Sequence, residues 1–161
     1  MIYLGFDPGL SGGVACVPAA PDHGPVRASV MPVSGDQIDA RALGIFVWEH
    51  VLKHDSAVIA VVEQVGAMPK QGLSSTFKFG KGYGTILGVL WALGVRTELV
   101  APQRWKAAVL AGTPKDKDAA VAYCRRAFSE VNLRRTDRCT TDHDGMAEAL
   151  CIAEYGRRTF K

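Results

Sequence analysis

The chain has 161 residues, of which 48% are hydrophobic and 22% charged, and this excludes a disordered chain, a collagen-like repeat and a fibrous protein. Its longest apolar stretches are much shorter than the roughly 20 residues of a membrane helix, and no secretory signal is visible, so we expect a cytoplasmic protein without membrane contact. The net charge of +3 is unevenly divided: residues 1–64 carry 3 Lys/Arg against 7 Asp/Glu and residues 65–161 carry 16 against 9, which favours a polyanion-binding second half.

Apolar runs bounded by turn signals predict five strands, at residues 2–6, 12–18, 26–33, 57–62 and 95–100. The first three are closely spaced and should form antiparallel hairpins, whereas the continuous apolar run of the fourth is typical of a central strand. Apolar spacing and capping signals predict five helices: from Asp36 or Asp39 to 53, from Ser74 or Ser75 to 93, at 102–111, at 116–131, and from Asp142 or Asp144 to 158. This order predicts an α/β fold with a five-stranded mixed sheet, three antiparallel N-terminal strands and two parallel ones, flanked by helices.

Acidic residues stand at the ends of two predicted strands. Asp7 follows the first strand and Glu63 the fourth, and adjacent central strands would bring both to the same edge of the sheet. Asp144 and Glu148 are four residues apart near the start of the last helix, so they share one helix face. Converging carboxylates repel one another, and the usual remedy is a hard cation, so we expect Mg²⁺, with Mn²⁺ as a substitute.

Two such ions in one active site can activate water and stabilise the leaving oxygen of a phosphodiester. Beside a basic half of the chain, the carboxylates therefore predict metal-dependent cleavage of nucleic acid. Asp142 and His143 are reserve ligands. Each residue also has a simpler interpretation: Asp7 as a turn former, Asp144 as a helix N-cap, and Glu148 or His143 as a solvated side chain.

A family resemblance is visible in five stretches, namely GFDPGLSGG (5–13), VEQVGAMPKQG (62–72), FKFGKGYG (77–84), PQRWK (102–106) and DHDGMAEALCIAEYG (142–156). Together they resemble the RuvC Holliday-junction resolvases, and most closely the short RuvC-like proteins of bacteriophages and prophages. The resemblance spans nearly the whole chain. It implies a ribonuclease H-like fold, with residues 1–161 as one nuclease domain, and a homodimer. It also implies paired symmetric nicks across a four-way DNA junction, in recombination or in the processing of branched phage DNA.

The same resemblance implies site residues. Asp7 and Glu63 fall on the family's catalytic carboxylates, which bind metal. The family's aspartate before an Ala-Leu dipeptide falls on Glu148. Its partner one turn earlier falls near Gly145, and Asp144 is the nearest acid.

Two family lysines that approach the DNA backbone correspond to Lys106 and Lys117. One family feature is missing, because the aromatic residue that stacks at the junction centre is replaced by Gly66. Met68 or an aromatic such as Phe77 could take its place, which leaves the sequence preference of cleavage open.

Basic and aromatic residues are interleaved between residues 70 and 83, where lysines would neutralise phosphates and aromatic rings would stack on unpaired bases. A second basic loop precedes the acidic helix. The residues that we expect to contact DNA are Lys78, Lys81, Lys106, Lys115, Lys117, Arg134 and Arg135. The alternatives are a solvated basic surface and, for the glycine-rich helix, core packing or the dimer interface that the family forms nearby.

Three other functions are compatible with parts of the sequence. A nuclease for flaps, forks or RNA would use the same carboxylates. An ATP-binding protein of the actin, sugar kinase and Hsp70 group has a similar first phosphate loop, but it needs two such domains, and no second glycine-rich phosphate turn is visible. A non-catalytic junction-binding protein would not need the complete set of carboxylates.

Overall fold

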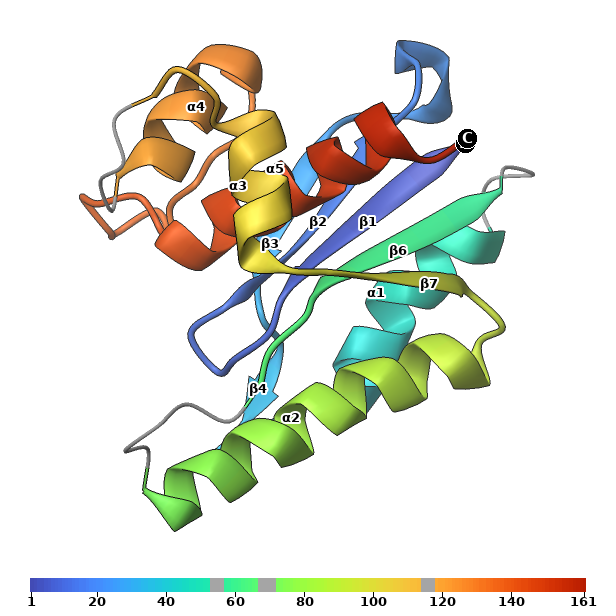
Figure 1. Ribbon diagram of the computed structural model, residues 1–161, viewed down its shortest axis with the longest axis vertical. Helices are drawn as coiled ribbons and strands as arrows, with labels where there is room; N and C mark the ends of the chain where they lie inside the picture. Colours follow the sequence, from blue (N-terminus) through green and yellow to red (C-terminus); the bar gives the residue numbers. More distant parts are fainter. Residues whose placement is uncertain (53–56, 67–71, 114–117) are drawn as a thin grey trace.

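A computed structural model describes residues 1–52, 57–66, 72–113 and 118–161. Its main sheet has five strands in the order β3-β2-β1-β6-β7 (Figure 1). The strands are β1 (Ile2–Asp7), β2 (Gly13–Pro18), β3 (Arg27–Val30), β6 (Val58–Glu63) and β7 (Arg96–Val100). β1, β2 and β3 pair antiparallel, while β6 is parallel to both β1 and β7. The predicted α/β fold, with three antiparallel and two parallel strands in one mixed sheet, is confirmed.

The predicted third strand is shorter than expected. β3 ends at Val30, and a separate small hairpin follows, made of β4 (Val33–Ser34) and β5 (Gln37–Ile38). Pro32 explains the break because it has no N–H to continue a ladder. Asp36 lies in the turn of this hairpin and caps no helix.

Five α-helices follow the predicted order: α1 (Ala40–Leu52), α2 (Leu73–Ala92), α3 (Pro102–Val109), α4 (Ala119–Ala127) and α5 (Asp144–Thr159). A short 3₁₀ helix, η1 (Pro21–His23), lies between β2 and β3. Asp39 caps α1, because its Oδ1 accepts a hydrogen bond from the Ala42 amide at 3.0 Å. Within the described ranges, every helix is too short or too polar to span a lipid bilayer.

Several helix boundaries differ from the prediction, among them the end of α3, at Val109 rather than 111, and two of the differences have a visible cause. α4 ends at Ala127 rather than at 131, because the side chain of Phe128 turns into the core and packs edge-on against Tyr123 at 6.2 Å between ring centroids. α5 has neither predicted aspartate as its cap. The N-cap is His143, whose Nδ1 accepts a hydrogen bond from the Met146 amide at 3.3 Å.

The helices form two layers on opposite faces of the sheet. α1 and α2 cover one face, and α3, α4 and α5 cover the other (Figure 1). Alternate residues of β1 serve the two layers: Tyr3 packs toward α5, whereas Leu4 and Phe6 pack toward α1 and α2. The central strands are therefore covered on both faces, and their ends remain as the accessible edge.

α5 lies close against β1 and β2. A side chain at Gly5 would overlap the Ala149 carbonyl oxygen, and one at Gly13 would overlap the backbone of Gly145. Glycine is needed at these points because only a residue without Cβ lets two backbones approach so closely. This close contact places the middle of α5 next to the end of β1.

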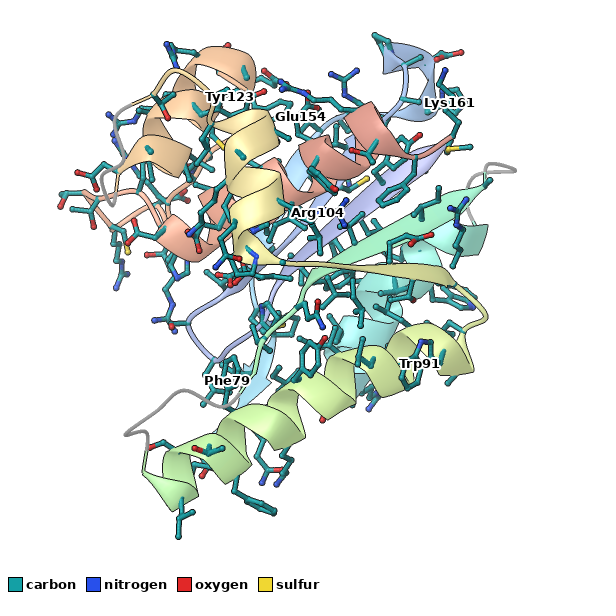
Figure 2. All side chains as sticks on the ribbon, viewed as in Figure 1. Phe79, Trp91, Arg104, Tyr123, Glu154 and Lys161 are labelled. Carbon is teal, nitrogen blue, oxygen red and sulfur yellow. The ribbon has the colours of Figure 1, made fainter. Side chains whose placement is uncertain are left out.

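The end of α5 is fixed by a buried carboxylate. Glu154 is 1% exposed and accepts hydrogen bonds from Arg157 at 2.6 and 2.7 Å and from Arg158 at 2.8 Å. Arg158 also donates to the Ala108 carbonyl of α3 and to the Tyr123 hydroxyl of α4. The three helices of this layer are thus joined by one polar cluster, of which Glu154 and Tyr123 are labelled in Figure 2.

Candidate active site

Two carboxylates meet at one edge of the sheet. β1 and β6 run parallel with Phe6 opposite Val62, so the next residues, Asp7 and Glu63, leave their strands side by side. Both side chains are half-buried. Such an edge, beyond the carboxyl ends of parallel strands, is where open α/β sheets place their sites.

Glu148 of α5 joins this pair from the layer above the sheet. Burial, and then the charges of Glu148 and Glu63, raise the pKa of Asp7 to about 8, while Lys106 opposes the shift. Burial also raises the pKa of Glu63, although a hydrogen bond from Trp105 counteracts it. Glu148 therefore lies near enough for its charge to act on both carboxyls at the ends of β1 and β6.

Two consecutive residues of α3 contact this group. Trp105 is fully buried, and its Nε1–H donates to Oε2 of Glu63 at 2.6 Å. Lys106 places its ammonium 3.1 Å from Oε1 of Glu148 and 5.0 Å from the centre of the Trp105 ring. The structure thus places Lys106, expected at the DNA backbone, among the carboxylates.

The donor chemistry fits a hard divalent cation. Carboxylate oxygens are the ligands that Mg²⁺ and Mn²⁺ prefer, and a cation would relieve the carboxylate repulsion that adds to the effect of burial on the pKa of Asp7. In the part of the chain that the structure describes, however, no three Asp, Glu, His or Cys side chains are arranged closely enough to hold one ion. The residues fit the metal, but with Lys106 paired to Glu148 they are not gathered around one position.

Comparison with known proteins identifies the fold. No protein-family model matches the sequence, and no curated protein matches it. RuvC from Thermus thermophilus matches in structure with a TM-score of 0.60 and 22% identity, over 98% of this chain and 96% of that one. The T. thermophilus RuvC in complex with a Holliday junction substrate matches with a TM-score of 0.61 and 19% identity, over 99% and 96%.

The fold is ribonuclease H-like. The yeast mitochondrial Holliday junction resolvase Ydc2 is also similar, with a TM-score of 0.57 and 16% identity, over 97% of this chain and 77% of that one. None of these three structures comes from a bacteriophage, so they lend no support to the phage or prophage type expected from the sequence.

On this ribonuclease H-like scaffold, the beginning of α5 holds the remaining acidic candidates. Asp144 is exposed on the first turn of α5, one turn before Glu148. Its neighbour Gly145 packs against Gly12, so this turn lies beside the loop that follows Asp7. Asp144 is therefore near the edge of the site and points into solvent.

The two reserve ligands have structural contacts. Asp142 accepts a hydrogen bond from Arg125 of α4 at 2.6 Å, and His143 caps α5. Both contacts hold the beginning of α5 in place. Their role as reserve metal ligands stays a prediction.

The basic candidates lie on two surfaces. Lys78 of α2 forms an ion pair with Asp36 at 2.9 Å, and Lys81 is exposed one turn later. Arg134 and Arg135 are exposed in the loop before α5. Three other residues from the sequence analysis, Met68, Lys115 and Lys117, lie outside the described residues.

The aromatic candidates differ in their surroundings. Phe77 is 73% exposed on α2. Phe79 lies near the loop after β1, where it lines a cavity of about 260 Å³ with Gly9 and Leu10 (Figure 2). Gly66, which replaces the aromatic residue of the resembling family, is exposed.

Trp105 was not among the site residues expected from the sequence. In the PQRWK stretch, only Lys106 was expected to have a role. A signal was present, because a tryptophan is a large apolar residue that favours burial, and a buried indole N–H usually has a hydrogen-bond partner.

Proposed function

We propose that this protein is a divalent-metal-dependent endonuclease that resolves four-way DNA junctions by paired symmetric nicks. The observation that carries the proposal is the convergence of Asp7, Glu63 and Glu148 at one edge of a ribonuclease H-like sheet. The similarity to a RuvC structure bound to a Holliday junction substrate, and to a yeast junction resolvase, supports the choice of substrate.

The residues of this site would have different roles in metal binding and DNA binding. Asp7, Glu63, Glu148 and Asp144 would hold Mg²⁺ or Mn²⁺, with two ions per site. Bound metal supplies an activated water and charge stabilisation for the leaving oxygen of a phosphodiester. Lys106 balances the carboxylates in the absence of metal and would meet a phosphate of the bound DNA. Lys81 and the Arg134–Arg135 loop would position the DNA backbone.

Symmetric nicks require two sites, and the outward face of α2 offers a surface for a second copy. On this face a row of exposed, uncharged residues recurs every three or four positions, and the exposed Lys78 and Lys81 lie outside the row. The row includes Gly80, Gly84 and Gly88. A side chain built at any of these three glycines would meet no atom within 4 Å, so packing inside the chain does not require glycine there. The residues of this α2 stripe are Leu73, Phe77, Gly80, Gly84, Gly88 and Trp91.

The α2 stripe is symmetric about Gly84. Gly80 and Gly88 stand four residues to either side, and Phe77 and Trp91 stand seven to either side. Two antiparallel α2 helices would therefore meet glycine to glycine at the centre, with each Phe77 against a Trp91. Such a self-complementary surface is what a two-fold homodimer needs.

The decisive experiment uses a labelled four-way junction, a linear duplex and a flap, each with Mg²⁺ or with EDTA. We expect paired symmetric nicks in the junction that need metal, with the duplex spared. Asp7→Asn should bind the junction without cutting it. Equal cutting of every substrate would indicate a general nuclease, and binding without cutting would indicate a junction-binding protein; either result would overturn the proposal.

A further inference from the structure

Trp105 is a fully buried side chain whose single polar atom reaches the candidate active site. It lies on α3, between the exposed residues Arg104 and Lys106. Its Nε1–H donates to Oε2 of Glu63 at 2.6 Å, across 42 positions of the chain. The ring packs in the core formed by α3, α4, α5 and the sheet, so the indole has little freedom to turn away.

We propose that Trp105 is a positioning residue that holds one carboxylate oxygen of Glu63 and leaves the other, Oε1, for a metal ion. This inference rests on the metal site of the proposed function. A carboxylate can accept bonds at both oxygens, and one fixed donor selects which oxygen remains available. A hydrogen bond to an ionised acceptor is short and strong, which agrees with the 2.6 Å separation.

Tryptophan suits this role better than most donors. The indole N–H only donates, so it neither binds the metal itself nor reverses the direction of the bond. It is also neutral, in contrast to Lys106, which pairs with Glu148 from the next position on the same helix. A metal ion that enters the site competes with the ammonium of Lys106 for Glu148. It displaces no charge at Trp105, because the indole is neutral. The Trp105–Glu63 bond should therefore persist with and without metal.

The first test is the substitution Trp105→Phe, which keeps an aromatic ring and removes the N–H. Loss of a group that orients a metal ligand typically costs about 10-fold to 100-fold in metal affinity, and we expect a loss of that size for Mg²⁺ by calorimetry. Junction cleavage should need correspondingly more Mg²⁺ and recover in part at saturation. Trp48→Phe is the matched control, because Trp48 is 50% exposed on α1, away from the carboxylates.

The second test is independent of cleavage, and its main readout uses the wild-type protein. The chain has three tryptophans, so a ¹⁵N spectrum should contain three indole N–H signals. Trp48 and Trp91 are 50% and 64% exposed, so their indole protons should exchange quickly with D₂O, whereas that of Trp105 should exchange slowly. The slow signal should shift when Mg²⁺ is added, and it should already be displaced in Glu63→Gln.

The outcomes separate this inference from the proposed function. A folded Trp105→Phe protein that binds Mg²⁺ as tightly as Trp48→Phe would overturn the role of Trp105 and leave the nuclease intact. A slowly exchanging indole signal whose position does not change at saturating Mg²⁺ would also overturn the role of Trp105. If the wild-type signal responds to Mg²⁺ but no junction is cut, the positioning role stands and the proposed function fails.

Discussion

The ammonium of Lys106 lies 3.1 Å from the carboxylate of Glu148. This ion pair joins α3 to α5 beside the candidate active site. It places a positively charged side chain where a metal ion would also relieve the repulsion among Asp7, Glu63 and Glu148. Lys106 also lowers the pKa values of Asp7 and Glu63, against the larger effect of burial. The metal-free site is therefore partly neutralised by its own lysine.

Removing this lysine should change metal binding in a definite direction. In Lys106→Met, Mg²⁺ no longer competes with an ammonium, so we expect Mg²⁺ to bind severalfold more tightly by calorimetry. Lys106→Arg keeps the charge and serves as the control. Weaker Mg²⁺ binding in Lys106→Met than in Lys106→Arg would show that the lysine supports the metal rather than competes with it.

Asp7→Asn should stabilise the metal-free protein, and more so at high pH. Burial and the charges of Glu148 and Glu63 raise the pKa of Asp7 to about 8 from 3.8. Because the folded state keeps a proton that the unfolded chain has lost, the stability of the wild type falls as pH rises from about 4 to 8. Each pKa unit corresponds to about 1.4 kcal/mol, and because Asp7 is only half-buried the solvent screens part of this effect, so the gain at pH 8 should be on the order of 2–4 kcal/mol.

Urea denaturation in EDTA at several pH values measures this effect. The difference in unfolding free energy between Asp7→Asn and the wild type should grow with pH and then level off above about pH 8. The exposed Asp137, substituted by Asn, is the control. A difference that stays constant with pH would contradict the raised pKa.

Disruption of the α2 stripe should yield monomers. Gly84→Glu places two like charges at the proposed two-fold axis, while the helix itself should gain stability because glycine is a poor helix former by about 1 kcal/mol. We expect light scattering to give half the mass of the wild type, with unchanged helix content by circular dichroism. Thr159→Glu, at an exposed position of α5, should leave the mass unchanged. A dimer that survives Gly84→Glu would exclude this surface.

The two lysines of α2 should differ in their contribution to DNA binding. Lys81 is exposed, whereas the charge of Lys78 is already paired with Asp36 at 2.9 Å. Lys81→Ala should weaken junction binding and reduce the salt-dependence slope by about 1. Lys78→Ala should have a smaller effect, and equal effects in binding titrations would mean that the Asp36 pair opens on DNA.

Much of the fold could be predicted from local patterns. The strands and helices follow apolar periodicity, and the meeting of Asp7 with Glu63 follows from two parallel neighbouring strands. Pro32 broke the third strand because a single residue without an N–H outweighs the β-propensity around it. These results depend on neighbours in sequence or on simple topology.

Other features depend on contacts that local patterns do not encode. The Trp105–Glu63 bond joins residues 42 positions apart, and it exists only because α3 packs over the end of β6. In the same way, Asp142 pairs with Arg125, 17 positions earlier, once α4 and α5 are packed. A carboxylate near a predicted site can thus be engaged elsewhere by a partner that only tertiary structure supplies.

The glycines beneath α5 have a consequence for how this protein can vary. The separation between Asp7 and Glu148 is set by main-chain atoms in contact at Gly5 and Gly13, with no side chain between the two backbones. Core side chains can change in size without altering that spacing, whereas one added methyl group at position 5 or 13 would push the helix off the strand. The spacing of the site is therefore least tolerant of substitution at positions such as 5 and 13, which carry no functional group at all.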